Sequence, residues 1–375
     1  MTRVLVVTTS FPRHASDAAG AFLVPLCRAL QANGCEVRVM APHAAGPLDD
    51  VVEGVPAIRV RYAPVARETL FYGAGAPVRL ARELGVLRGG LLSGGVTTAF
   101  VRGILGLRRD VDVVYAHWLV PAGLAAVVAR ALGGPPVVLH AHGSDVRLLQ
   151  RVPGGGLLTR MMGTRVEGVV APSEELARAT EVVLGRNVTV LPLPVMLSRS
   201  SASFPRHDVG FLGRLIPQKG VDVLLRAAAR GTLSVLVGGD GPERRSLEQQ
   251  ASASGAKVTF AGMVAPSDRA AFMRAITVLA VPSVSPEGAP AVVAEAQGCG
   301  VPVVASRTGG LVEMVDAACL VPPGDDVALA DALGRVVMDA AWREELQRDQ
   351  RRRAQTRNPD VLGPQYAALL RAATA

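Results

Sequence analysis

The sequence has few cysteines and aromatic residues, and it has no apolar run of membrane-spanning length. Its 375 residues include 4 Cys. No two of them form a C-x-x-C pair, so neither a zinc site nor a disulfide framework is indicated. No stretch reaches the roughly 18 uninterrupted apolar residues of a transmembrane helix, and the N-terminal apolar run is too short for a signal peptide. We therefore expect a cytoplasmic protein that is soluble or at most peripheral to a membrane.

Two patterns of nucleotide-binding proteins are also missing. Neither half of the chain has G-x-G-x-x-G after its first apolar run, which disfavours a nicotinamide oxidoreductase. The basic run at 351–353 has no interleaved aromatic residues and lies among acidic ones, so we expect no nucleic-acid partner. The formal charge of +8 is almost entirely arginine. It favours acidic partners such as phosphates, although a GC-rich genome would leave the same bias.

Short apolar runs alternate with helical stretches through a chain that is 49% hydrophobic. Such runs are typical of strands buried on both faces of a parallel sheet. They form two series, so we predict two doubly wound α/β domains at 1–197 and 208–357, with a polar linker at 198–207. The last stretch, 358–375, has helical spacing and is expected to cross back to the first domain. Ligands of such sheets bind beyond the carboxyl ends of the strands, so we expect a cleft between the domains.

Polar residues and a glycine follow the predicted strands of the first domain. Gly20 precedes a helix, where backbone N–H groups could approach a phosphate, although a plain helix-entry turn is the alternative. His117 ends one strand, and "HAHGSD" at 140–145 ends the next. The three imidazoles of His117, His140 and His142 could bind a metal, but no other cluster of metal-ligand residues accompanies them, so we predict no metal site. His142 fits better as a polar residue that reaches into the cleft, with a hydrogen-bonded strand-end histidine as the alternative.

Two cations follow the first strand of the second domain. In "GRLIPQKG", Arg214 and Lys219 are flanked by glycines and could hold a diphosphate, while solvated loop charges are the alternative. "GGDGP", with Gly239 and Gly241, ends the next strand. It is similar to the start of a nucleotide-binding loop but lacks the third glycine.

Two carboxylates, Glu287 and Glu295, stand on either side of a predicted helix start at Pro290. They lie up to ~12 Å apart by helical rise and so are not a close catalytic pair. A carboxylate that faces paired hydroxyls can grip a ribose, and the N–H groups of Gly288 and Ala289 would meet a polar ligand at the helix start. The alternative for Glu295 is an ion-paired acid on a half-buried helix.

The ordered motifs resemble family 4 (group 1) of the retaining glycosyltransferases. The set consists of "FLGRLIPQKG", "VGGDGP", "FAGMV" and "PSVSPEGAPAVVAEAQGCGVPVVASRTGG", followed by Glu313, and it has the E-x7-E spacing typical of that family. In the first half, "TTSFPRHASDAAGAF", "DVVYAHWLVPAGLAA" and "HAHGSDV" are similar to the family's acceptor domain. The resemblance implies the GT-B fold, in which two Rossmann-like domains face each other across a cleft.

The resemblance also implies an activity and roles for residues. The protein would move a sugar from a nucleotide-diphosphate sugar to a hydroxyl acceptor with retention, without a metal or other cofactor. The acceptor would be a lipid-linked saccharide, a polysaccharide precursor or a small metabolite. The implied catalytic residues are Glu287, His142, Arg214 and Lys219. Glu295 would bind the ribose, and the other donor-binding residues would be Gly20, Gly239, Gly241, Met263, Val264, Gly288, Ala289, Pro290, Thr308, Gly309 and Gly310. The implied acceptor-binding residues are His117, His142 and Asp145.

Some features depart from the family pattern or leave alternatives open. "PLPVM" at 192–196 stands where many relatives have P-x-G-V-D, and Ala289 replaces a commonly larger residue. The basic segment 77–110, with Leu80, Leu84, Leu87 and Leu91 on one face, could contact an anionic inner membrane leaflet or could be an ordinary packed helix. The alternative functions are a nucleotide-sugar epimerase of the same fold and a non-catalytic nucleotide-sugar-binding protein.

Overall fold

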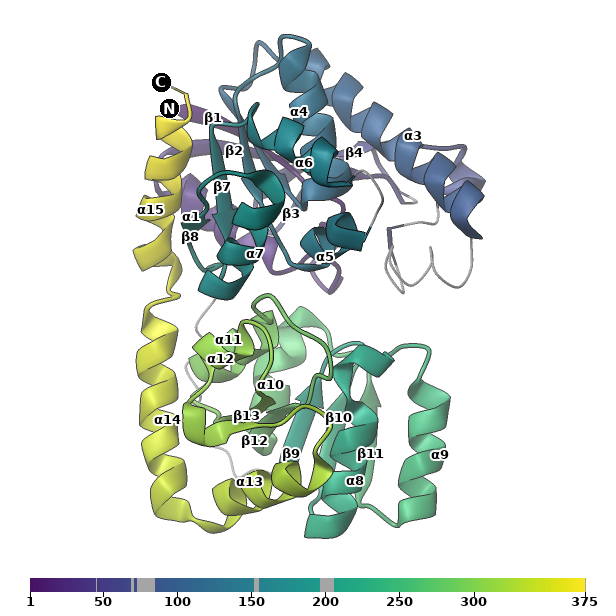
Figure 1. Ribbon diagram of the computed structural model, residues 1–375, viewed down its shortest axis with the longest axis vertical. Helices are drawn as coiled ribbons and strands as arrows, with labels where there is room; N and C mark the ends of the chain where they lie inside the picture. Colours follow the sequence, from purple (N-terminus) through teal and green to yellow (C-terminus); the bar gives the residue numbers. More distant parts are fainter. Residues whose placement is uncertain (45, 69–70, 73–84, 152–154, 196–205, 375) are drawn as a thin grey trace. The chain divides into compact units, whose positions relative to one another are not determined.

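The computed structural model describes residues 1–44, 46–68, 71–72, 85–151, 155–195 and 206–374. The chain divides into two compact α/β units (Figure 1). Unit 1 comprises Met1–Pro194 and Leu362–Ala375, and unit 2 comprises Val195–Val361. Of the predicted linker, residues 198–205 lie outside those described. His207 already belongs to the first strand of unit 2.

Unit 1 contains an eight-stranded sheet with the strand order β3-β4-β2-β1-β5-β6-β7-β8. Its strands are β1 (Thr2–Val7), β2 (Cys35–Pro42), β3 (Asp49–Val52), β4 (Val55–Val60), β5 (Val113–His117), β6 (Val137–His140), β7 (Gly168–Ala171) and β8 (Thr189–Val190). Neighbouring strands are parallel except for the β3–β4 hairpin. The sequence did not predict this antiparallel edge. Its turn residues, Glu53 and Gly54, both have positive φ (49° and 82°), as a tight two-residue hairpin requires.

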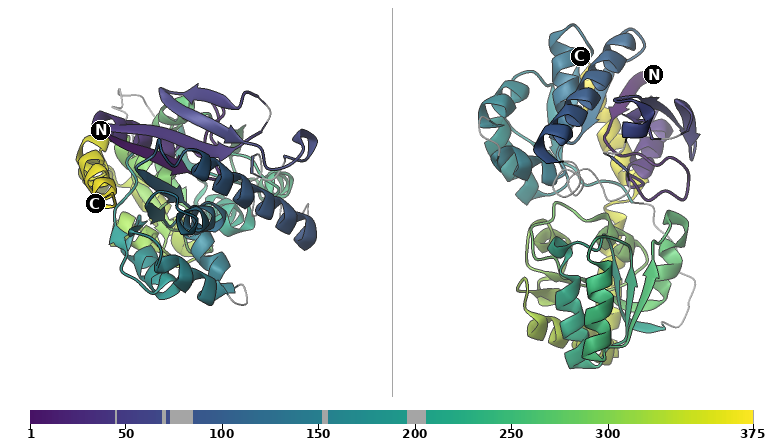
Figure 2. Two further views of the ribbon diagram at one scale, coloured as in Figure 1. Left: turned by 90° about the horizontal axis from the view of Figure 1, so that it is seen from above. Right: turned by 90° about the vertical axis from the view of Figure 1, so that its right-hand side faces the viewer.

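Helices cover both faces of the unit 1 sheet (Figures 1 and 2). Along β1, Val4 and Val6 pack with α1 and α15, whereas Leu5 and Val7 pack with the core beneath α3, α4, α5, α6 and α7. Burial on both faces explains the continuous apolar runs. The helices are α1 (Leu23–Ala32), α3 (Gly85–Gly106), α4 (Leu124–Ala131), α5 (Ser144–Arg151), α6 (Gly155–Gly163), α7 (Glu174–Leu184) and α15 (Pro359–Ala372).

Helix α3 accounts for most of the basic amphipathic segment. Residues 77–84, with Leu80 and Leu84, lie outside those described. Further along α3, Val96, Phe100 and Ile104 are buried in the core of unit 1, so this part of the segment is a packed helix. None of the described helices combines the length and the apolar content needed to cross a bilayer. Contact with a membrane surface stays a prediction.

Unit 2 contains a six-stranded, wholly parallel sheet with the order β11-β10-β9-β12-β13-β14. Its strands are β9 (His207–Leu212), β10 (Val235–Gly238), β11 (Val258–Gly262), β12 (Ile276–Val281), β13 (Val303–Ser306) and β14 (Leu320–Val321). Its helices are α8 (Val221–Gly231), α9 (Arg244–Ser254), α10 (Arg269–Arg274), α11 (Ala291–Gly298), α12 (Leu311–Met314), α13 (Asp326–Met338) and α14 (Ala340–Gln355). The strand order changes direction beside β9, so the loops after β9 and β12 lie at the position where such sheets bind ligands.

Helix α15 completes the core of unit 1. Tyr366 is fully buried, and its hydroxyl donates to the carbonyls of Leu191 (2.8 Å) and Pro192 (3.2 Å). The ring therefore ties the last helix to the segment that follows β8.

We predict that unit 1 depends on this ring for its stability. Tyr366→Ala should lower the free energy of unfolding by about 3–5 kcal/mol because it opens a cavity. Tyr366→Phe should cost about 1 kcal/mol because only the hydroxyl is lost. Urea unfolding can be followed through Trp118 in a Trp342→Phe background, since the chain has 2 Trp. Unchanged midpoints in both variants would show that α15 does not support unit 1.

Candidate active site

An ion pair joins the loops that follow β9 and β12 in unit 2. Lys219, at the end of the turn Pro217–Lys219, donates from Nζ to Oε1 of Glu287 at 2.5 Å. The two side chains are only 20% and 17% exposed. Ser283, which is fully buried, donates to the same oxygen at 2.5 Å. The Glu287 carboxylate is therefore held in one orientation at the carboxyl edge of the sheet.

Arg214 lies in the same loop after β9 but differs from Lys219 in its environment. Its side chain is exposed, and no described residue forms a hydrogen bond or ion pair with its guanidinium. Arginine carries its charge at all physiological pH values and can bind an anion through two parallel N–H groups. Arg214 is thus available to an anionic ligand, whereas Lys219 already shares its charge with Glu287.

The predicted donor-binding glycines have a packing role in this structure. A Cβ at Gly239 would lie 1.8 Å from the carbonyl oxygen of Gly213, and one at Gly241 would lie 2.3 Å from that of Leu215. The loop after β10 therefore lies directly on the loop after β9, which carries Arg214. Close backbone contact alone requires glycine at both positions.

The loop after β13 packs in the same way on Glu287. Gly309 has φ 57°, and a Cβ there would lie 2.2 Å from the Glu287 carbonyl oxygen. Gly310 donates its N–H to that same carbonyl at 2.8 Å. Thr308, just before them, donates its N–H to Ser306. The loops after β9 and β13 thus both contact Glu287, which lies in the loop after β12.

Glu295 is ion-paired in this structure, as the alternative interpretation expected. It lies in α11, and Arg269 at the start of α10 donates from Nη1 to its Oε1. The two side chains are 18% and 24% exposed. Among the described residues, Glu295 Oε2 and Arg269 Nε have no hydrogen-bond partner although both atoms are buried. The ion pair fixes the carboxylate, and a role in binding ribose stays a prediction.

The remaining predicted donor residues lie around the start of α11 and after β11. Pro290 is the N-cap of α11, so the helix begins at Ala291, one residue later than predicted. Ala289 packs against the core of unit 2, and Gly288 links it to Glu287. After β11, Met263 is 65% exposed and Val264 is partly buried. An exposed methionine at a carboxyl edge could contact a flat apolar group.

In unit 1, three histidines stack at the ends of β5 and β6. The ring centroids of His117 and His140 are 4.8 Å apart, as are those of His140 and His142. A hydrogen bond of 3.0 Å joins His117 Nδ1 and His142 Nε2. Burial lowers the pKa of all three rings, that of His142 to about 3. The cluster is therefore uncharged at neutral pH. No group of described residues has the composition and geometry to hold a metal ion.

His142 is the member of this cluster that is partly exposed. His117 is fully buried and Asp145 is 3% exposed, so neither presents an open surface in this structure, and a role for either in binding an acceptor stays a prediction. Asp145 instead accepts the N–H groups of Leu119 (2.8 Å) and His142 (3.1 Å). Burial raises the pKa of its carboxyl group, against the effect of these N–H groups. His117 and Asp145 thus position His142.

An aromatic surround of His142 was not predicted. Trp118 stacks on its ring with centroids 4.3 Å apart, and Phe22 meets it edge-on at 5.5 Å. Trp118 has φ 66°, a conformation that costs energy for a bulky residue and is most common at functional sites. The sequence signal was the pair of aromatic residues Phe22, two positions after Gly20, and Trp118, directly after His117.

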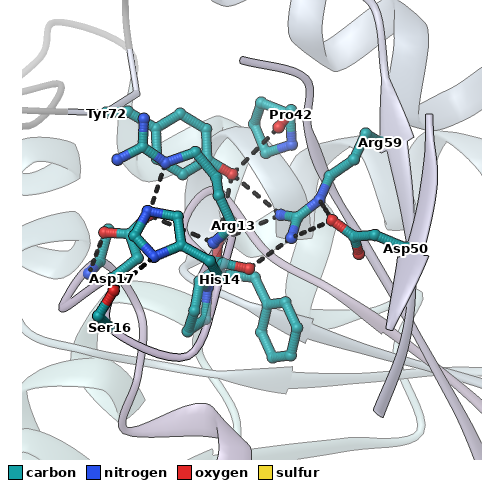
Figure 3. A network of polar contacts seen from close by, with 11 residues as sticks. Arg13, His14, Ser16, Asp17, Pro42, Asp50, Arg59 and Tyr72 are labelled. Atoms are coloured by element: carbon teal, nitrogen blue, oxygen red, sulfur yellow. Dashed lines mark hydrogen bonds and ion pairs between the residues drawn. The ribbon is translucent and has the colours of Figure 1, made fainter. Parts of the chain in front are cut away.

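Figure 3 shows a polar network around Arg59 and Tyr72, which contacts the loop between β1 and α1. Gly20 belongs to the same loop. Arg59 of β4 donates to the carbonyls of Phe11 (3.1 Å) and Pro12 and to the carboxylate of Asp50. The Tyr72 hydroxyl lies 3.1 Å from the Arg59 guanidinium, and burial raises the pKa of Tyr72 to about 12. After these contacts the loop reverses direction, so that Gly20 lies against the backbone of Ser10.

Gly20 is required at that fold-back. It has φ 72°, and a Cβ there would lie 2.1 Å from the carbonyl oxygen of Ser10. The fixed loop conformation therefore explains this glycine without any ligand. Sequence reasoning missed Arg59, Arg269 and Ser283, because their partners are distant in the chain or unmarked by a motif.

The histidine cluster predicts how stability depends on pH. Each ring is neutral in the folded protein, whereas the unfolded chain takes up a proton below a pKa of ~6.5. Stability is therefore complete above that pH and falls as pH decreases, by up to about 1.4 kcal/mol per pH unit for each histidine. Urea unfolding monitored by Trp118 between pH 7 and 5 should show this slope, and His142→Gln should reduce it. A ring signal of His142 that titrates near pH 6.5 by NMR would contradict the account.

Comparison with known proteins identifies the family. Residues 206–339 match the family described as Glycosyl transferases group 1, and residues 19–199 match Glycosyltransferase Family 4. The chain is 31% identical to a D-inositol 3-phosphate glycosyltransferase of Saccharomonospora viridis, over 86% of this chain and 81% of that protein. It is 30% identical to a GDP-mannose-dependent monoacylated alpha-(1-6)-phosphatidylinositol monomannoside mannosyltransferase of Corynebacterium glutamicum, over 66% of this chain and 74% of that protein.

Solved structures share the fold over the whole chain. A sucrose-phosphate synthase from Thermosynechococcus elongatus has a TM-score of 0.80 at 21% identity, covering 99% of this chain and 98% of that one. The Anabaena protein Alr3699/HepE in complex with UDP-glucose has a TM-score of 0.73 at 21% identity, covering 98% of each chain. With the two family matches and two Rossmann-like units, the chain belongs to the GT-B glycosyltransferases of family 4, group 1.

Proposed function

We propose that this glycosyltransferase moves a sugar from a nucleoside diphosphate to a hydroxyl acceptor with retention and without a metal ion. The observation that carries the proposal is the group of Arg214, Lys219 and Glu287 at the carboxyl edge of the unit 2 sheet. It combines an exposed cation that has no partner among the described residues, a cation shared with a carboxylate, and a carboxylate of fixed orientation. The two cations can stabilise the negative charge of a diphosphate leaving group, and the carboxylate can accept hydrogen bonds from the hydroxyl groups of a sugar.

The charges fit the chemistry of the departing diphosphate. When the bond between the sugar C1 and the phosphate oxygen breaks, the electron pair stays on the diphosphate and positive character develops on the sugar ring. Fixed cations at the diphosphate stabilise this separation. Arg214 and Lys219 supply two positive charges there, so the residues themselves can do what a divalent ion does in other transferases. The acceptor oxygen then bonds to C1 on the face that the phosphate leaves, and its proton goes to the phosphate oxygen.

The acceptor that we propose carries a phosphate group besides its reactive hydroxyl. Both curated relatives described above are named for substrates of this kind, an inositol phosphate and a phosphatidylinositol mannoside. His142 is neutral, partly exposed and rigidly held, so it can accept or donate a hydrogen bond to a hydroxyl without adding charge. The comparisons do not favour the epimerase or the non-catalytic alternative.

Release of nucleoside diphosphate tests the proposal directly. The protein is incubated with UDP-, GDP-, ADP- and dTDP-sugars, with and without a phosphorylated polyol, in buffer containing EDTA. We expect one donor to release its nucleoside diphosphate, faster with acceptor, at a rate that EDTA leaves unchanged. No release from any donor would contradict transferase activity, and restoration of activity by Mg²⁺ would contradict metal independence.

The two acids should have separate roles. Glu295→Gln keeps a hydrogen bond to Arg269 but removes the charge that grips a ribose, so the affinity for the nucleoside diphosphate should fall roughly tenfold. Glu287→Gln should leave that affinity within about twofold but lower kcat by about 10²-fold or more. Calorimetric titration and initial rates measure both effects. The control is Glu248→Gln, a partly exposed acid paired with Arg244. Equal loss of nucleotide affinity in both variants would refute the division.

The two lysines of the chain offer a matched test of the leaving-group role. Lys219→Ala removes a cation from the donor group, and we expect kcat to fall by about 10²–10³-fold. Lys257→Ala removes the same charge from an exposed position just before β11 and should leave kcat unchanged. A similar kcat for the two variants would mean that Lys219 does not stabilise the transition state.

A further inference from the structure

A groove in unit 1 lies between helix α3 and the end of β4. It has a volume of about 650 Å³ and is lined by Val60, Arg61, Tyr62, Gly95, Thr98, Ala99, Arg102 and Gly103. This volume is in the range of small-molecule sites. Figures 1 and 2 show α3 as the long helix along one side of unit 1. None of these residues belongs to the sites described above.

Glycines bring the helix backbone close to the strand. A Cβ at Gly95 would lie 2.4 Å from the Tyr62 carbonyl oxygen, and one at Gly103 would lie 2.6 Å from the end of the Met40 side chain. The two glycines are eight positions apart, so they lie on one face of the helix. This close approach forms the floor of the groove. Thr98 and Ala99, whose side chains are small, line it on the helix side.

Two arginines give the groove a positive charge. Arg102 is exposed, and no described residue pairs with its guanidinium. Arg61 is 51% exposed and lies 4.0 Å from Glu68. Glu68 is already engaged by His43 at 2.5 Å and by the N–H of Tyr62 at 3.2 Å. Among the described residues, no other acid contacts Arg61 or Arg102. The groove thus has two guanidinium groups, and the one carboxylate that the described residues show near them contacts Arg61 alone. Two such groups can bind the oxygens of a phosphate.

We propose that this groove binds the phosphate group of a phosphorylated hydroxyl acceptor, with Arg61 and Arg102 holding the phosphate oxygens. The inference rests on the proposed transfer to such an acceptor and names the residues that would select it. Hydroxyl groups of the ligand can bond to the helix side of the groove through the Thr98 oxygen, whose own proton is donated to Gly94 at 2.9 Å. A neutral polyol would lack the ionic contacts and should bind far more weakly.

The test uses the full chain without donor. Glycerol 3-phosphate and glycerol are titrated at constant ionic strength while the amide signals of Gly95 and Gly103 are followed by NMR. We expect saturable shifts with glycerol 3-phosphate and not with glycerol. Arg61→Ala and Arg102→Ala should each weaken binding roughly tenfold or more. Thr98→Phe changes no charge but fills the groove, and it should weaken binding to a similar extent.

The matched control is Arg108→Ala, an exposed arginine just after the end of α3, which should leave binding within about twofold. Sedimentation with phosphatidylglycerol vesicles, against phosphatidylcholine vesicles, distinguishes the source of the phosphate. Binding of glycerol 3-phosphate that depends on both arginines indicates a soluble acceptor. Binding to phosphatidylglycerol alone, lost in both variants, indicates a lipid headgroup. Both results support the groove.

Three outcomes would overturn the proposal. They are equal weakening by Arg108→Ala, equal binding of glycerol and its phosphate, and absence of binding to every probe. Thermal stabilisation by nucleoside diphosphate and donor breakdown, measured in the Arg102→Ala protein, should equal those of the unaltered protein. If the groove does not bind phosphate, donor breakdown is still measured and the proposed function still stands. If the unaltered protein does not break down any donor, phosphate binding in the groove can still be measured.

Discussion

The ion pair between Lys219 and Glu287 joins the loops that follow two neighbouring strands of the unit 2 sheet. The arrangement of the other loops depends on it. Gly310 donates its N–H to the Glu287 carbonyl, and Ser283 donates its hydroxyl to the Glu287 carboxylate. Without a ligand, the carboxylate gives the half-buried ammonium a partner. When a diphosphate arrives, Lys219 can use its remaining N–H donors for phosphate oxygens while Glu287 stays in position. Under the proposed function, these two side chains are already in position before the donor binds, which would reduce the reorganisation required during transfer.

In unit 1, the histidine cluster at the ends of β5 and β6 excludes charge. Burial keeps the three stacked histidines neutral. The Asp145 carboxylate accepts hydrogen bonds from the backbone N–H groups of Leu119 and His142. His142 therefore presents a neutral ring held by aromatic neighbours. The two arginines of the α3 groove contrast with it, since they place positive charge at the surface of the same unit. A hydroxyl beside His142 and a phosphate in the groove would be recognised by different chemistry.

Local sequence patterns predicted the strands and helices of this structure, but they did not predict which side chains contact each other across the fold. The apolar runs predicted the parallel strands, and Pro290 predicted the start of α11, because both signals act over a few residues. The resemblance of the motifs predicted the family. By contrast, Arg269 is 26 positions from Glu295, and only the packing of α10 against α11 brings them together. Gly239 and Gly309 were expected to bind the donor, and the structure shows that contact with another loop already requires glycine at each position. His117 looked available at a strand end, but the depth of its burial depends on Tyr115, Tyr366 and the helices around them. The β3–β4 hairpin was missed because its first strand is short and polar.

Retention at the sugar is the central claim of this account, and the anomeric configuration of the product tests it most directly. The one-bond carbon–proton coupling at the anomeric carbon can be measured by NMR in the first product formed from an α-linked donor. Departure of the diphosphate and attack of the acceptor on the same face predict an α-linked product. A β-linked first product would contradict that geometry and would require a base on the opposite side of the sugar.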